Sequence, residues 1–110
     1  MILKTLMIID KIDKLSLLKI KIVNLKEYCE FHEHELMLEV VVMGSAVVYF
    51  NTIADNDELI SDDIVIALCN NSLSANNINP INKLNIHTVT AGIGEILTKK
   101  AEGWQDYLII

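Results

Sequence analysis

The chain has 110 residues, of which 52% are hydrophobic and 22% are charged. This length and composition predict one folded domain over residues 1–110 and argue against a disordered segment. Nine lysines, no arginine and fifteen acidic residues give a net charge of −6. That balance argues against nucleic-acid binding, because such proteins usually carry a basic stripe and use arginine to contact bases.

Neither a membrane span nor a signal peptide is predicted. The longest apolar run, Val40–Phe50, has eleven residues interrupted by a Gly-Ser pair, whereas a spanning helix needs about 20 residues. The first residues reach Asp10 before any small-residue cleavage pattern. We therefore expect a cytoplasmic protein without membrane contact, in which Cys29 and Cys69 are free thiols.

The first half of the chain alternates between strand and helix patterns. Leu3–Asp10 is predicted to be a strand, and a helix is expected from about Asp13, which would serve as its N-cap. Leu36–Gly44 is almost continuously apolar, as is typical of a strand covered on both faces. Its glycine ends the strand, and Ser45 is expected to cap a short helix. The apolar positions of the first helix recur every three or four residues, at Leu15, Leu18, Ile22, Leu25 and Cys29.

The second half continues the alternation. The acidic segment Ala54–Asp63 is predicted to be a connection, with room for one helical turn at Glu58–Ser61. Three further strands are then expected, separated by a short polar helix after the third strand and a longer helix at Ile93–Gly103. Those strands are Ile64–Leu68, Ile86–Thr90 and Asp106–Ile110. Five strands alternating with helices predict an α/β fold, a three-layer α/β/α sandwich with a five-stranded, mostly parallel sheet.

Cys69 is the main candidate for a functional residue. Functional groups of open parallel sheets gather at the carboxyl ends of the strands, and Cys69 directly follows the predicted strand Ile64–Leu68. The N–H groups of a helix beginning there would favour the nucleophilic thiolate, and Asn70, Asn71 and Ser72 could add hydrogen-bond donors. The position also suits a small buried hydrophobic residue, so the residues alone leave both interpretations open.

Two glycine turns also fall at predicted strand ends. One contains Gly44, and the other is the sequence Ala91–Glu95, which begins a helix with Gly92. A dinucleotide-binding fingerprint would need a third glycine where this chain has Leu97. A small-molecule or nucleotide site built on these two turns and on the turn after Asp10 is an alternative hypothesis, and no cofactor is predicted.

The remaining candidate residues favour structural roles. His32 and His34 are two residues apart without a third ligand at suitable spacing, so no metal site is predicted. Cys29 lies on the apolar side of the first helix and is expected to fill the core. Gly103 is expected to end the last helix in the left-handed conformation, with the Trp104 ring covering the core or a subunit contact.

The order of these features resembles the DsrE/DsrF-like family, small α/β proteins of sulfur-relay and intracellular sulfur-oxidation systems. Upstream, Glu39–Val47 is similar to the family's second strand, turn glycine and following helix, and Asn24 fits its first helix. Near the C-terminus the family has a glycine turn, a helix with an early acid, and a Gly-Trp pair before the last strand. The matching residues are Gly92, Ile93, Glu95, Gly103 and Trp104.

The resemblance implies a function for Cys69. It falls where the sulfur-carrying members have their active cysteine, which accepts sulfane sulfur as a persulfide and passes it to a partner. The resemblance also implies a homo-oligomer, trimer or hexamer, with sulfur donor and acceptor proteins as further partners. A non-catalytic assembly subunit of the same fold, in which Cys69 only packs, is the second hypothesis.

Overall fold

Five parallel strands form one sheet in the order β4-β3-β2-β1-β5. The computed structural model describes all residues, 1–110. The predicted α/β fold is confirmed, and the sheet is parallel at every strand pair. The strands are β1 (Ile2–Ile9), β2 (Glu35–Val42), β3 (Ile64–Cys69), β4 (Ile86–Val89) and β5 (Gln105–Leu108).

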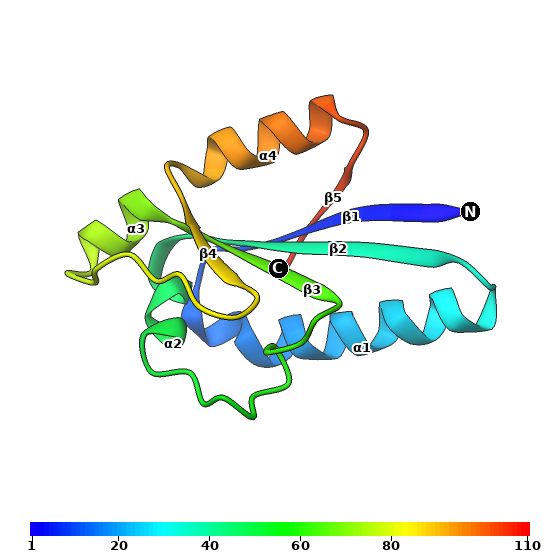
Figure 1. Cartoon of the computed structure of the whole chain (residues 1–110), viewed down its shortest axis with the longest axis horizontal. Coiled ribbons are helices and arrows are strands. Elements are labelled where there is room, and N and C mark those ends of the chain that lie inside the picture. The colour runs from blue at the N-terminus through cyan, green and yellow to red at the C-terminus, as the bar shows by residue number, and fades with distance from the viewer.

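The helices cover both faces of this sheet. They are α1 (Leu15–Phe31), α2 (Val47–Asn51), α3 (Asn70–Ala75) and α4 (Gly92–Ala101), with short 3-10 turns η1 (Ile12–Lys14) and η2 (Gly44–Ala46). Figure 1 shows α1 and α2 on one side of the sheet and α4 on the other, while α3 continues from the carboxyl end of β3. The structure is therefore the predicted three-layer sandwich. None of its helices combines the length and the apolar character that crossing a membrane requires.

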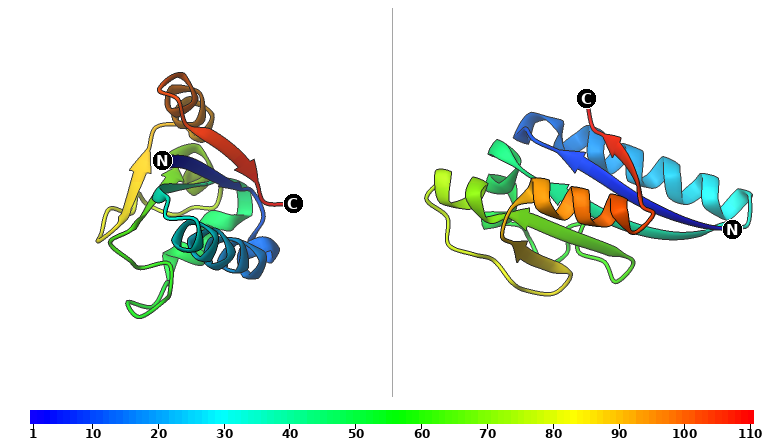
Figure 2. Two further views of the ribbon diagram at one scale, coloured as in Figure 1. Left: turned by 90° about the vertical axis from the view of Figure 1, so that its right-hand side faces the viewer. Right: turned by 90° about the horizontal axis from the view of Figure 1, so that it is seen from above.

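The main core lies between the sheet and the α1–α2 layer. Met7, Val40 and Ile66 from the strands pack there with Leu18 and Phe50 from the two helices. The buried side of α1 is the one predicted from the spacing of its apolar residues, and Cys29 is buried on that side. The opposite layer contains only α4, which leaves more apolar surface exposed. Figure 2 shows β5 as the edge strand beyond β1, with α1 beneath the neighbouring strands.

Two predicted helix caps are wrong. Asp13 lies inside η1, and α1 begins at Leu15 without a side-chain capping bond. Ser45 lies inside η2, and its hydroxyl oxygen accepts a hydrogen bond from the Ile12 N–H at 3.0 Å. Each 3-10 turn redirects the chain after a strand, which places the two predicted cap residues inside a turn. The hydrogen bond of Ser45 links the turn after β2 to the turn after β1.

The predicted helical turn at Glu58–Ser61 is also absent. Asp57 instead accepts a hydrogen bond from the N–H of Leu59 at 2.9 Å, which holds a local turn. The other carboxylate oxygen of Asp57 accepts a hydrogen bond from the Tyr49 hydroxyl and lies 3.3 Å from Lys19 Nζ. These contacts tie the acidic connection to α1 and α2 before β3 begins.

Candidate functional site

The carboxyl edge of the sheet brings Cys69 together with the start of α4. Cys69 is the last residue of β3, and Gly92 is the first residue of α4. A Cβ placed on Gly92 would lie 3.3 Å from the Cys69 Cβ and 2.6 Å from the Met43 Sδ. Only glycine fits between the two sulfur-containing side chains without displacing Met43. The close approach directs the N–H of Gly92 towards the cysteine.

The turn after β2 joins the same cluster through Ser72. The N–H of Gly44 donates a hydrogen bond to the Ser72 hydroxyl oxygen at 2.8 Å. Gly44 has a φ of +55°, and a Cβ there would lie 2.2 Å from the carbonyl oxygen of Asp10, so this turn requires glycine. Because the Ser72 oxygen already accepts a bond from Gly44, the hydroxyl proton is available to the Cys69 sulfur.

The surroundings of Cys69 favour its thiolate. Burial opposes ionisation, but the N–H groups of Gly92, Ser72 and Asn71 and the Ser72 hydroxyl outweigh it and hold the pKa of Cys69 below its ordinary value. Hydrogen-bond donors stabilise the negatively charged sulfur more than the neutral thiol. A lowered pKa increases the thiolate fraction at neutral pH.

The predicted site residues contribute in different ways. Gly44, Ser72 and Gly92 gather around Cys69 as described. Asn71 contributes its main-chain N–H, while its side chain is exposed. Asn70 is half-buried, and its side chain forms no hydrogen bond within the chain. The side-chain amides are therefore not the donors that the sequence suggested, because the first turn of a helix presents its main-chain N–H groups to the residue before it.

Cys69 is less accessible than its position at a strand end predicted. Its residue is only 6% exposed, and none of the five surface cavities is lined by it. Val42 of β2 pairs with Leu68 of β3, so the next residues along the two strands, Met43 and Cys69, lie side by side. Met43 and the first residue of α4 both lie close to the Cys69 side chain. We infer that access to the sulfur depends on movement of the flexible Met43 side chain.

A separate groove lies along the first turns of α4. Thr88, Thr90 and Thr98 contribute hydroxyl groups to it, and Glu95 is its one charged residue. A carboxylate at this position repels phosphate, and the lining contains no lysine. The groove therefore lacks the positive charge that a nucleotide site uses at a helix N-terminus, which argues against nucleotide binding at the turn before α4.

Glu39 is a buried polar residue that no pattern in the sequence indicated. It points from β2 towards α4, is 3% exposed, and its Oε2 has no hydrogen-bond partner. Burial, together with the carboxylates of Glu95 and Glu102, raises its pKa to about 8, against the opposing effect of Lys99. The Lys99 Nζ lies 3.9 Å from Glu39 Oε1. A single acid within an apolar run gives no local signal that it is buried.

The histidines and the tryptophan lie away from Cys69. His32 is exposed and His34 is half-buried at the opposite end of the sheet, where their rings stack with centroids 6.0 Å apart. Gly103 has the predicted positive φ, of +95°. Trp104 is half-buried rather than part of the core, and the Lys99 Nζ lies 5.0 Å from the centroid of its ring.

Comparisons with known proteins support the fold. No protein-family model matches the sequence, and no curated protein matches it. Among solved structures, the chain is similar to a protein of unknown function from Methanobacterium thermoautotrophicum, with 22% identity and a TM-score of 0.79. The match covers 96% of this chain and 98% of the other. At this identity the likeness shows a shared fold over nearly the whole length of both chains.

Proposed function

We propose that this protein is a sulfur-relay protein in which Cys69 carries sulfane sulfur as a persulfide. The observation that carries the proposal is the set of donors around the cysteine. Three main-chain N–H groups and the Ser72 hydroxyl lower its pKa although the residue is buried and the chain has a net charge of −6. Close donors outweigh distant charges, which solvent and salt screen. The resemblance to the DsrE/DsrF-like family supports the same role.

The chemistry needs no cofactor and no added oxidant. The Cys69 thiolate attacks the outer sulfur of a donor persulfide, a new S–S bond forms, and the donor leaves as its own thiolate. In the second step an acceptor thiolate attacks the outer sulfur on Cys69, and Cys69 leaves as a thiolate. Each step forms one S–S bond and breaks another, so the electrons balance. The donors around Cys69 stabilise the leaving thiolate as well as the attacking one.

The cover over Cys69 suits transfer between docked proteins. Met43 is half-buried and flexible, so a partner that displaces it from Gly92 would reach the sulfur. Without such a partner, the same cover would protect a persulfide from other thiols in solution. The proposed partners are therefore a sulfur donor protein and an acceptor protein that approach the carboxyl edge of the sheet.

We further propose a cytoplasmic homo-oligomer, trimer or hexamer. Apolar side chains exposed in the layer that contains α4 support this part of the proposal. Val65 on β3 is 42% exposed, and Ile93 and Leu97 on α4 are 68% and 61% exposed. Apolar groups gathered on one layer are typical of surfaces that pack against another copy. Both cysteines are free, which suits a reducing compartment. Light scattering that gives only the monomer mass of 12.4 kDa at micromolar concentration would contradict the oligomer.

Intact mass spectrometry tests the carrier role. The protein is incubated with a cysteine desulfurase and cysteine, and the wild type is expected to gain the mass of one sulfur atom. Cys69→Ser should abolish this gain, whereas the matched control Cys29→Ser, at the other buried thiol, should retain it. Sulfur uptake by Cys69→Ser, or its loss in Cys29→Ser alone, would refute the assignment. No uptake by any form would favour the assembly subunit, in which Cys69 only packs.

A further inference from the structure

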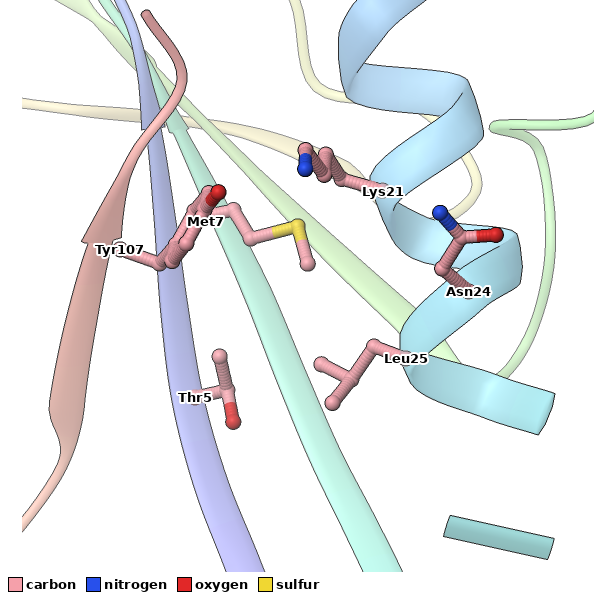
Figure 3. Close-up of a pocket in the computed structure, with 6 residues that line it drawn as sticks. All are labelled: Thr5, Met7, Lys21, Asn24, Leu25 and Tyr107. Carbon is pink, nitrogen blue, oxygen red and sulfur yellow. The ribbon is translucent and has the colours of Figure 1, made fainter. Parts of the chain in front are cut away.

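A groove on the other face of the sheet opens between α1 and the edge strand β5. Its volume is about 290 Å³, and six residues line it: Thr5, Met7, Lys21, Asn24, Leu25 and Tyr107. Figure 3 shows α1 on one side and β1 with β5 on the other, with the Lys21 side chain extending from the helix towards the strands. The groove exists because the sheet extends one strand beyond the part that α1 covers.

The floor of the groove is apolar and continuous with the core. Met7 is 3% exposed and belongs to the main core cluster, and Leu25 packs against that cluster. The ring of Tyr107 forms the wall on the β5 side. A volume near the lower end of the range for ligand sites, about 300–1,000 Å³, suits a small molecule with an apolar body.

Lys21 is the one charged residue of the groove, and it has no carboxylate partner. Five other lysines form salt bridges, at positions 14, 19, 26, 99 and 100. Of the four lysines without one, Lys4, Lys11 and Lys83 are exposed, and Lys21 alone is half-buried. Its Nζ lies 5.8 Å from the centroid of the Tyr107 ring. In a chain with fifteen acids, a half-buried lysine that has no carboxylate partner leaves its charge available to an anion from outside the chain.

The geometry points to this groove as a binding site for a small organic acid, with its apolar body on Met7, Leu25 and the Tyr107 ring and its carboxylate on the Lys21 ammonium. The Asn24 amide and the Thr5 hydroxyl form no hydrogen bond within the chain and border the same groove. They supply further polar groups at its rim. The site is independent of Cys69, which lies on the opposite face of the sheet, so either proposal can fail without the other.

Three probes that share one apolar body test the charge preference. The full chain, labelled with ¹⁵N, is titrated with 3-phenylpropanoate, its neutral amide and the corresponding amine, and the backbone amide signals are followed by NMR. The acid is expected to shift the signals of Thr5, Met7 and Tyr107, and to bind about tenfold more tightly than the amide, as a charge-assisted hydrogen bond predicts. Equal binding of the acid and the amide, or shifts located elsewhere, would overturn the proposal.

Matched variants assign the effect to Lys21. Lys21→Met keeps the length of the side chain and should weaken binding of 3-phenylpropanoate about tenfold. Lys11→Met removes the same charge at an exposed, unpaired position and should leave binding unchanged. Equal losses in both variants would mean that only net charge matters and would refute a site at Lys21. If the groove amides stay unshifted and Lys21→Met changes the oligomer mass, a second copy covers the groove and the ligand proposal is wrong.

Discussion

The buried carboxyl of Glu39 makes the stability of this protein depend on pH in a direction opposite to that of a typical paired acid. Its pKa is about 8 in the folded chain, against 4.5 for an unperturbed glutamate. Below pH 4.5 both the folded and the unfolded states hold the proton, so the group adds no dependence on pH. Between 4.5 and about 8 only the unfolded chain releases the proton, and stability falls as pH rises. Above about 8 both states are ionised and the loss is complete.

The size of the effect follows from the same two values. Each pH unit inside the window changes the free energy of unfolding by about 1.4 kcal/mol. The slope is smaller near both ends of the window, so ionisation of Glu39 removes about 3 kcal/mol of stability between pH 5 and pH 8, less than three full steps. Glu39→Gln retains the shape of the side chain without the ionisation. The amide placed beside Glu95 also changes the free energy of unfolding, but by nearly the same amount at every pH within this window.

Urea denaturation at pH 5, 6.5 and 8 measures the difference. The stability of Glu39→Gln relative to wild type should rise by about 3 kcal/mol from pH 5 to pH 8. Glu35→Gln is the matched control, because Glu35 lies on the same strand and is exposed, and its difference from wild type should stay constant. If the difference for Glu39→Gln is also the same at all three pH values, the buried carboxyl does not titrate within the folded state as argued.

Four further substitutions test how the carboxyl edge, α4 and the C-terminal turn are built. Met43→Ala should increase the rate at which iodoacetamide alkylates Cys69 severalfold, because it removes the cover; an unchanged rate would mean that the start of α4 alone limits access. Gly44→Ala should destabilise the fold by at least about 2 kcal/mol in urea, since the residue needs a positive φ and its methyl group would clash with a main-chain carbonyl. Gly94→Ala, with no atom within 4 Å of the new methyl group, should instead be neutral or stabilise α4 by up to about 1 kcal/mol, and equal losses at both glycines would contradict this reasoning. Trp104→Ala should cost about 1–3 kcal/mol in the same assay, less than the about 3–5 kcal/mol of a fully buried aromatic residue; a loss in the higher range would show that the ring is part of the core.

The order of strands and helices could be predicted from the sequence because local patterns determine it. Continuous apolar runs mark β2 and β3, and the spacing of Leu15, Leu18 and Ile22 marks the buried side of α1. The helix starts were predicted less well. Asp13 and Ser45 are common capping residues, but both lie in 3-10 turns whose shape depends on contacts between the ends of β1 and β2.

The position of Cys69, at the end of a strand and before a helix, follows from local patterns, because both elements depend on neighbouring residues. Its surroundings depend on how distant segments pack together. Gly44, Ser72 and Gly92 come from three separate segments, and the parallel sheet brings them to one edge around the sulfur. The same packing covers Cys69 with Met43. Burial and pKa depend on the atoms that surround a side chain, and those atoms belong to residues distant in the chain, so no local pattern could reveal them.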